Sequence, residues 1–559
     1  MIKILKTLLA AIFLINTGFA QTNSKKTASL EVPHDWFQLD LKTSGYNGIS
    51  LDKAYELIKT KKLKSNKVIV AVVDSGIDTL HEDLKPILWT NSKEIPGNGI
   101  DDDHNGYVDD VHGWNFLGNK DGRNVTDEGD EGVRTYYALK PKWDGKEVDE
   151  SKLSAADKRE YELYLETKEK VAANVDPMQT EMLKMMLSKL KIGDSIIRKE
   201  LGKEQYNAKD LADYHPGNFY ARGTRELLIE VTKENKGDDV SNAELIEELQ
   251  GEVHKGEALS TPFVDERKAI VRDDENNIYD RFYGNGDIMA GTPFHGSHCS
   301  GIIAARRDNG VGIQGIADNV SIMMIRTVAG GDEHDKDVAN AIRYAVDNGA
   351  RIINISLGKG YSPQKQWVDD AILYAQKKGV LIVHAAGNDA KNIDTARNFP
   401  NPVFADGSGR ATNVITVGAS GDEKNGGLAA SFSNYGKKEV DLFAPGVNIY
   451  STIPGTATYG NASGTSMASP VVVGIAALIL EHYPDLTPQQ LKMALLKSSQ
   501  MPAEKVNLPG TQDKVNLADI SATGGIVNAY EAIKYAGTIK TEKKKDVLPK
   551  ATIKKTKVG

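Results

Sequence analysis

The sequence is poor in three features, and each absence excludes a class of protein. It has one cysteine, Cys299, so no disulfide can form within the chain, and a protein of 559 residues relies on core burial instead. The longest apolar run outside the N-terminus, residues 471–480, is too short to span a bilayer. No basic face accompanies the net charge of −8, which argues against nucleic acid as a main partner.

The first twenty residues have the pattern of a secretory signal peptide. Lys3 and Lys6 form a positive start, residues 8–15 an apolar stretch, and residues 18–20 a small-residue exit. The alternative is a buried N-terminal helix. No cysteine follows Ala20, which argues against a lipid anchor. We therefore expect the mature protein to be exported and soluble, in the periplasm or the medium.

From about residue 66, β-rich apolar runs alternate with amphipathic segments. The predicted strands are 68–73, 320–326, 351–356, 380–385, 414–417 and 440–443, and the predicted helices include 338–348 and 367–378. Strands buried on both faces and joined by helices predict an α/β fold with a mainly parallel β-sheet flanked by helices. In such sheets functional residues gather at the carboxyl ends of strands, and Asp74, Ser356 and Asn388 each lie at such an end.

Two segments depart from this alternation. Residues 131–275 are highly charged and contain helical patterns, which predicts a helical insertion on the surface of the α/β domain. The tail from residue 539 is rich in lysine, which is typical of a solvated end, with an electrostatic anchor to an anionic surface as the alternative.

Three short segments supply the parts of a nucleophilic site. Asp74 ends a predicted strand, His295 opens the segment 295–301 (HGSHCSG), and Ser466 lies in the segment 464–470 (GTSMASP). A serine hydroxyl is a poor nucleophile at neutral pH and needs a base, which His295 would provide while Asp74 fixes the imidazole tautomer. Pro470 suits the first turn of a helix, whose N-terminal dipole favours negative charge near Ser466.

A stabiliser of the developing oxyanion is also present. Residues 383–388 (VHAAGN) end a predicted strand in a Gly-Asn turn, which can aim the amide of Asn388 at the charge. The backbone N–H of Ser466 would be the second donor.

These blocks, in the order Asp, His, Asn and Ser, resemble the signature of the subtilisin-like serine peptidases, the subtilases. The resemblance covers about residues 45–118 and 280–535. It implies protein or peptide substrates and amide hydrolysis through an acyl-enzyme. It also implies that an extended substrate pairs with a strand of the enzyme. The residues expected to bind substrate are Ser356, Leu357, Gly358, Ala385, Ala386 and Gly387.

Other interpretations account for these residues less well. Taken singly, Asp74 fits a turn residue and His295 a structural histidine, but their joint occurrence with Ser466 favours catalysis. An inactive binding or chaperone module would have no use for the complete set. An α/β-hydrolase esterase would place its serine before the acid and the histidine. Cys299 is expected to be a buried core thiol rather than a nucleophile, although a bulky mercurial bound there would displace His295.

A second site is predicted in the acidic segment 99–110. Oxygen ligands at alternating positions and a glycine at the turn copy the first part of a calcium loop. Position twelve is His112 rather than glutamate, so this is not a complete EF-hand, and similar loops bind calcium in some subtilases. The predicted Ca²⁺ ligands are Asp101, Asp103, Asn105, the carbonyl of Tyr107, and either Asp109 or Asp110; a merely acidic turn is the alternative.

The predicted organisation has six parts. They are a signal peptide (1–20), an N-terminal extension (21–40), a first peptidase part (41–130), the helical insertion (131–275), a second peptidase part (276–538) and the lysine-rich tail (539–559). Many secreted subtilases have a folded N-terminal propeptide, for which residues 21–40 leave too little chain. The insertion is therefore expected either to assist folding in its place or to act as a lid or docking module. The sequence leaves the oligomeric state open.

Overall fold

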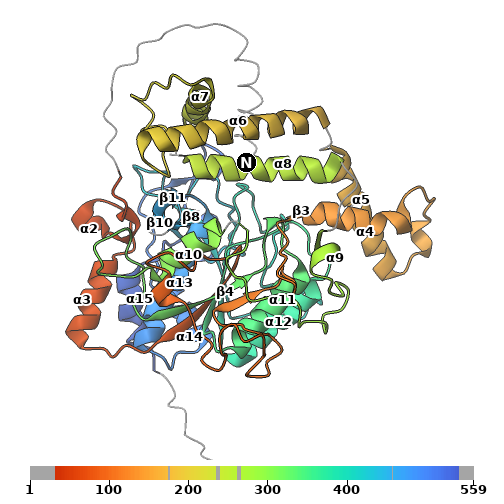
Figure 1. Cartoon of the computed structure of the whole chain (residues 1–559). Helices are drawn as coiled ribbons and strands as arrows, with labels where there is room; N and C mark the ends of the chain where they lie inside the picture. Colours follow the sequence, from red (N-terminus) through yellow and green to blue (C-terminus); the bar gives the residue numbers. More distant parts are fainter. Residues whose placement is uncertain are drawn as a thin grey trace, which may run out of the picture.

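The computed structural model describes residues 32–540 except 174–176, 235–239, 261–265, 292 and 456–457. The predicted signal peptide and all but the first two residues of the lysine-rich tail lie outside the described residues. Figure 1 shows the sheet domain, with further helices packed along one end of it.

A seven-stranded parallel sheet forms the centre of the molecule. Its order is β2 (Gly113–Asn115), β4 (Val320–Arg326), β1 (Val68–Asp74), β6 (Ile352–Ile355), β7 (Leu381–Ala385), β8 (Val414–Ser420) and β9 (Leu442–Pro445). Every neighbouring pair is parallel. The strands are rich in Val and Ile because helices cover both faces of the sheet. The predicted α/β fold, a mainly parallel β-sheet flanked by helices, is confirmed.

Helices form the two outer layers. On one face, α10 (Phe294–Ala304) and α13 (Thr465–His482) share a core with α3 (Leu51–Lys61), α14 (Pro488–Lys497) and α15 (Ala529–Ala536). On the other face lie α11 (Asp335–Asp347) and α12 (Lys365–Lys378). By length and composition α13 is the one helix of the described residues that passes as a membrane span, but 89% of its apolar window is buried, which makes it a core helix.

Between β1 and α10 the chain forms a group of helices. They are α4 (Glu131–Trp143), α5 (Ala155–Ala173), α6 (Pro177–Leu201), α7 (Phe219–Glu234), α8 (Asn242–Ser260) and α9 (Glu266–Ile270). α6, α7 and α8 enclose an apolar cluster of their own, and α4 and α5 enclose a smaller aromatic one. Figure 1 shows α6 and α8 side by side above the sheet domain.

Small elements complete the fold. A hairpin of β10 (Ile449–Ile453) and β11 (Thr458–Ala462) leads into α13, and β3 (Asp127–Gly129) pairs with β5 (Gly330–Gly331). The rest are α2 (Leu41–Ser44), β12 (Val506–Asn507), β13 (Lys514–Val515) and the 3-10 helices η1 (Trp36–Gln38), η2 (Lys85–Ile87), η3 (Glu150–Lys152) and η4 (Leu517–Asp519).

Candidate active site

Asp74 and His295 meet at the carboxyl end of β1. The carboxylate is 2% exposed, and its Oδ1 lies 2.8 Å from His295 Nδ1 and accepts the backbone N–H of Ser75 at 2.7 Å. Because a carboxylate only accepts hydrogen bonds, Nδ1 must carry the imidazole proton. In the neutral ring the other nitrogen, Nε2, is then unprotonated and can act as a base.

The electrostatics of this pair favour the protonated imidazole. Burial disfavours the charged ring, but the Asp74 carboxylate outweighs it and holds the pKa of His295 well above its ordinary value. The same attraction stabilises the imidazolium that forms when His295 accepts a proton.

Ser466 lies in the first turn of α13 and is tied to the end of β6. Its Oγ donates to the carbonyl of Ser356 at 3.0 Å, and Ser356 Oγ donates in return to the Ser466 carbonyl at 2.9 Å. The first N–H groups of a helix have no partner within it, so the Ser466 N–H is available near its own hydroxyl. These contacts fix the nucleophile segment against the central sheet.

Cys299 joins the histidine helix to the serine helix. Its Sγ lies 3.4 Å from the Ser466 carbonyl oxygen and 4.0 Å from His295 Nδ1. The thiol is fully buried, and burial raises its pKa, so it remains protonated. This is the environment of a packing thiol that lies close to the base.

Asn388 is oriented by the residue before the nucleophile. Its Oδ1 accepts from both the backbone N–H and the Oγ1 of Thr465, each at 2.9 Å. Since the N–H can only donate, this assigns the oxygen, and the amide Nδ2 lies on the other side. A Cβ added at Gly464 would lie 3.3 Å from that Nδ2, so the amide donor faces the backbone beside Ser466.

The segment after β6 has one edge paired and one edge open. The N–H and the C=O of Lys359 both bond to Phe399, each at 3.0 Å. Successive residues of an extended strand direct their backbone N–H and C=O groups toward opposite edges. The N–H and C=O of Gly358, an exposed residue, therefore point toward the other edge. The Ser466 hydroxyl bonds to Ser356 on that edge, which makes it the edge beside the nucleophile.

The remaining predicted substrate residues surround this edge. The Leu357 carbonyl lies 3.0 Å from His384 Nε2. Ala385 ends β7, and Ala386 is fully buried with its carbonyl bonded to Asn434. Gly387 has a φ of +94° and donates its N–H to Thr465 Oγ1 at 3.0 Å, so a side chain there would be strained.

An acidic cluster lies in the predicted calcium loop. Carboxylate oxygens of Glu94, Asp101 and Asp103 lie within 4.8 Å of one another, a donor set suited to a hard cation. Asn105 is next to them, since its backbone N–H bonds to both aspartates. Glu94 precedes the loop and carries no spacing signal, which is why sequence reasoning missed it.

The other predicted ligands are engaged differently. The carboxylate of Asp109 accepts the N–H groups of Gly97 and Gly99. Asp110 is fully buried and accepts from Asn91, Asn105 and Tyr344, and its burial raises its pKa to about 6. The Tyr107 ring is buried among aromatic side chains.

A parallel α/β sheet that carries a buried aspartate paired with a half-buried histidine, together with a serine at a helix N-terminus, has the parts of a serine hydrolase site. The chain belongs to the subtilase family, whose family model matches residues 65–520. It is a subtilase serine peptidase, as its sequence blocks predict.

Two named relatives are similar over part of the chain. The thermophilic serine proteinase of Bacillus sp. (strain AK1) is 33% identical, over 58% of this chain and 67% of its own length. Thermitase of Thermoactinomyces vulgaris is 37% identical, over 43% of this chain and 75% of its own. Among solved structures, that of proteases from Pseudoalteromonas arctica PAMC 21717 matches 90% of this chain and 97% of its own, at 19% identity and a TM-score of 0.44.

Proposed function

We propose that the protein is a secreted endopeptidase that cleaves protein substrates through an acyl-enzyme on Ser466. The observation that carries the assignment is the 2.8 Å contact between buried Asp74 and His295 Nδ1, which leaves Nε2 as the base. The Ser466 hydroxyl leaves the Ser356 carbonyl and passes its proton to His295 as it attacks the substrate carbonyl. His295 then protonates the leaving amine, and water, activated by the same base, hydrolyses the ester.

Two donors stabilise the tetrahedral oxyanion in this mechanism. They are the Asn388 amide, oriented by Thr465, and the Ser466 N–H at the start of α13. The substrate chain adds as a strand to the open edge of residues 356–358, beside the turn 385–387. Cys299 takes no part in bond making and positions the two helices.

The acidic cluster is proposed to hold a structural Ca²⁺. Glu94, Asp101 and Asp103 supply convergent carboxylates, and Asn105 and Asp110 adjoin them. A bound cation would offset the mutual repulsion of these carboxylates and thereby stabilise the loop.

Export by a cleaved signal peptide is supported by the charged start and apolar stretch of residues 1–20. The proposed division keeps residues 41–130 and 276–538 as one peptidase domain, interrupted by the insertion 131–275. Secretion is tested by N-terminal sequencing of the protein recovered from the producing cells' medium and periplasm. A mature N-terminus near residue 21 supports the proposal, and full-length protein retained in the cytoplasm contradicts it.

The activity is tested with a fluorophosphonate probe and a quenched protein substrate. Wild type is expected to be labelled and to cleave, and Ser466→Ala to do neither while melting at the wild-type temperature. A folded wild type that is not labelled would overturn the assignment. Ser463→Ala is the matched control, since Ser463 lies in the same segment and is expected to leave labelling intact.

A further inference from the structure

The open edge of residues 356–358 fixes which substrate residue faces which enzyme residue. The Ser356 carbonyl binds the nucleophile, so the substrate residue whose carbonyl is attacked lies opposite Ser356. Counting along an antiparallel strand, the second residue before the scissile bond lies opposite Leu357, the third opposite Gly358 and the fourth opposite Lys359. This register rests on the proposed function.

The face of the fourth side chain follows from the pleat. Opposed residues of paired strands point to the same face, and alternate residues share a face. The fourth substrate side chain therefore shares its face with the side chains of Leu357 and Lys359. What covers Lys359 on that face decides what the fourth position can accept.

Lys359 is covered by the first turn of α4. Its side chain is 2% exposed, and its Nζ lies 2.8 Å from Glu131 Oε2, 2.7 Å from the Glu333 carbonyl and 3.0 Å from Asp335 Oδ1. The next residue of α4, Gly132, is close to Tyr361: a Cβ added there would lie 3.0 Å from the tyrosine ring. The first turn of α4 thus packs against Lys359 and Tyr361.

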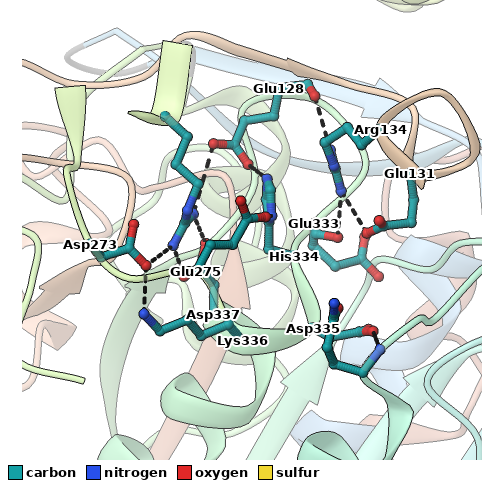
Figure 2. A network of polar contacts seen from close by, with 12 residues as sticks. Glu128, Glu131, Arg134, Asp273, Glu275, Glu333, His334, Asp335, Lys336 and Asp337 are labelled. Atoms are coloured by element: carbon teal, nitrogen blue, oxygen red, sulfur yellow. Dashed lines mark hydrogen bonds and ion pairs between the residues drawn. The ribbon is translucent and has the colours of Figure 1, made fainter. Parts of the chain in front are cut away.

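Arg134 holds this turn in place. Its guanidinium donates to Glu131 Oε2 and to the carbonyls of Glu128, Gly129, Asp332 and Glu333. Figure 2 shows Glu131, Arg134 and Glu333 meeting at one side of the network. On the same side β3 pairs with β5, so the turn is tied to the loop before α11 as well as to Lys359.

We propose that the first turn of α4, closed by the Glu131–Lys359 ion pair, is the specificity-determining wall for the fourth residue before the scissile bond. The wall consists of the desolvated Glu131–Lys359 ion pair and the backbone carbonyl of Glu333. A Phe or Leu there would have to displace the buried pair, which is strongly unfavourable. The enzyme is thus expected to accept small fourth residues and to gain nothing from large apolar ones.

The wild-type enzyme provides the first test. Chromogenic peptides share their first three residues and carry Gly, Ala, Leu or Phe at the fourth position; a blocked tripeptide lacks that position. We expect kcat/KM for Leu and Phe to equal or fall below that for Ala. A tenfold gain for Leu or Phe over Ala would overturn the proposal. Failure to cleave any peptide, the tripeptide included, would instead reject the proposed function on which it rests.

A paired substitution provides the second test. Glu131→Leu together with Lys359→Met replaces the ion pair by apolar groups of similar size, an exchange that buried pairs often tolerate. We expect the ratio of kcat/KM for Phe over Ala at the fourth position to rise at least fivefold, with the tripeptide unchanged. An equal change for all peptides would mean a purely structural role and refute the wall.

The matched control for this pair is Glu150→Leu with Lys152→Met. Both residues are exposed and belong to the same insertion, in η3, and Lys152 is one half of a surface ion pair with Asp149. The control variant is expected to keep the wild-type profile. If the Glu131/Lys359 variant does not fold, the wild-type profile alone decides.

Discussion

Asn388 offers the sharpest test of the site, because its two side-chain atoms have separate tasks. Oδ1 accepts two hydrogen bonds from Thr465, and Nδ2 faces the backbone beside the nucleophile. Asn388→Asp keeps the acceptor and removes the donor, whereas Asn388→Ala removes both. The two substitutions therefore separate catalysis from stability.

The expected losses follow from these contacts. Losing one oxyanion donor raises the barrier by about 2.7–4 kcal/mol, a fall of roughly 10²–10³ in kcat, and a carboxylate in its place adds repulsion. Both variants should therefore lose at least that factor with little change in KM. The Ala variant also loses two hydrogen bonds worth about 0.5–1.5 kcal/mol each, or roughly 1–3 kcal/mol of folding free energy.

The assay is kcat and KM on a chromogenic peptide, with thermal unfolding measured in the Ser466→Ala background to prevent self-digestion. Asn388→Asp should melt near the parent temperature and Asn388→Ala several degrees lower. If Asn388→Asp retains kcat within tenfold of wild type, the amide does not meet the oxyanion. If both variants melt alike, the bonds to Thr465 do not stabilise the fold as argued.

The other predictions concern the base, the thiol and the acidic loop. Because Asp74 raises the pKa of His295, kcat/KM should fall as the pH drops through that raised value. The substitution Asp74→Asn should shift this acid limb of the pH profile to lower pH and reduce kcat by about 10⁴. A pH profile of both enzymes tests the direction of the shift, and an acid limb that does not move contradicts it. Cys299→Ala should keep kcat within a few-fold and abolish inactivation by a mercurial, whereas retained inactivation would locate the reagent elsewhere, since the chain has one cysteine. Chelation of calcium should lower the melting temperature of the wild type but not of Asp101→Asn, which should already melt at a lower temperature. Equal responses of the two proteins would show that Asp101 is not a calcium ligand.

The sequence predicted the sheet well where strands are apolar and continuous. The strand 320–326 was predicted to the residue, and the strand from Val68 ends one residue later than predicted. The sequence did not predict β2 of this sheet or the strands of the three two-stranded sheets, among them β10 and β11. β2 has three residues with no apolar run, and the hairpin strands carry Ser, Thr, Tyr and Asn. Such strands are fixed by their neighbours rather than by their own pattern.

In the candidate site, too, some residues could be predicted from the sequence and others could not. Residue type and order along the chain predicted a role for Asp74, His295, Asn388 and Ser466, because acid–base and oxyanion chemistry need those groups. The residues that orient these groups or accompany them could not be predicted from the sequence. Thr465, which orients Asn388, and Glu94, which joins the acidic cluster, act through contacts between segments far apart in sequence.

The insertion is anchored where it leaves and rejoins the sheet domain, and this explains how it can contact residues of the candidate active site. Asn115 and Asn285 exchange both backbone hydrogen bonds, which brings its two ends together and limits the entropic cost of the long loop between them. Arg267, 3% exposed, bonds to Asp337 at 2.6 Å, and Lys336 bonds to Asp273, also at 2.6 Å. Both partners lie in the first turn of α11, directly after the loop that bears Glu333.

A buried ion pair contributes little net stability, but removing one partner is strongly unfavourable. Pairs of this kind therefore favour one docked position over neighbouring ones, where a charge would be left without its partner. In the segment just before Ser466, Gln205 exchanges two hydrogen bonds with Asn461, and Glu244 accepts the N–H of Ser463. The insertion thus contacts the segment before the nucleophile as well as Lys359. A change in its docking would therefore disturb residues next to the nucleophile and next to the end of β6.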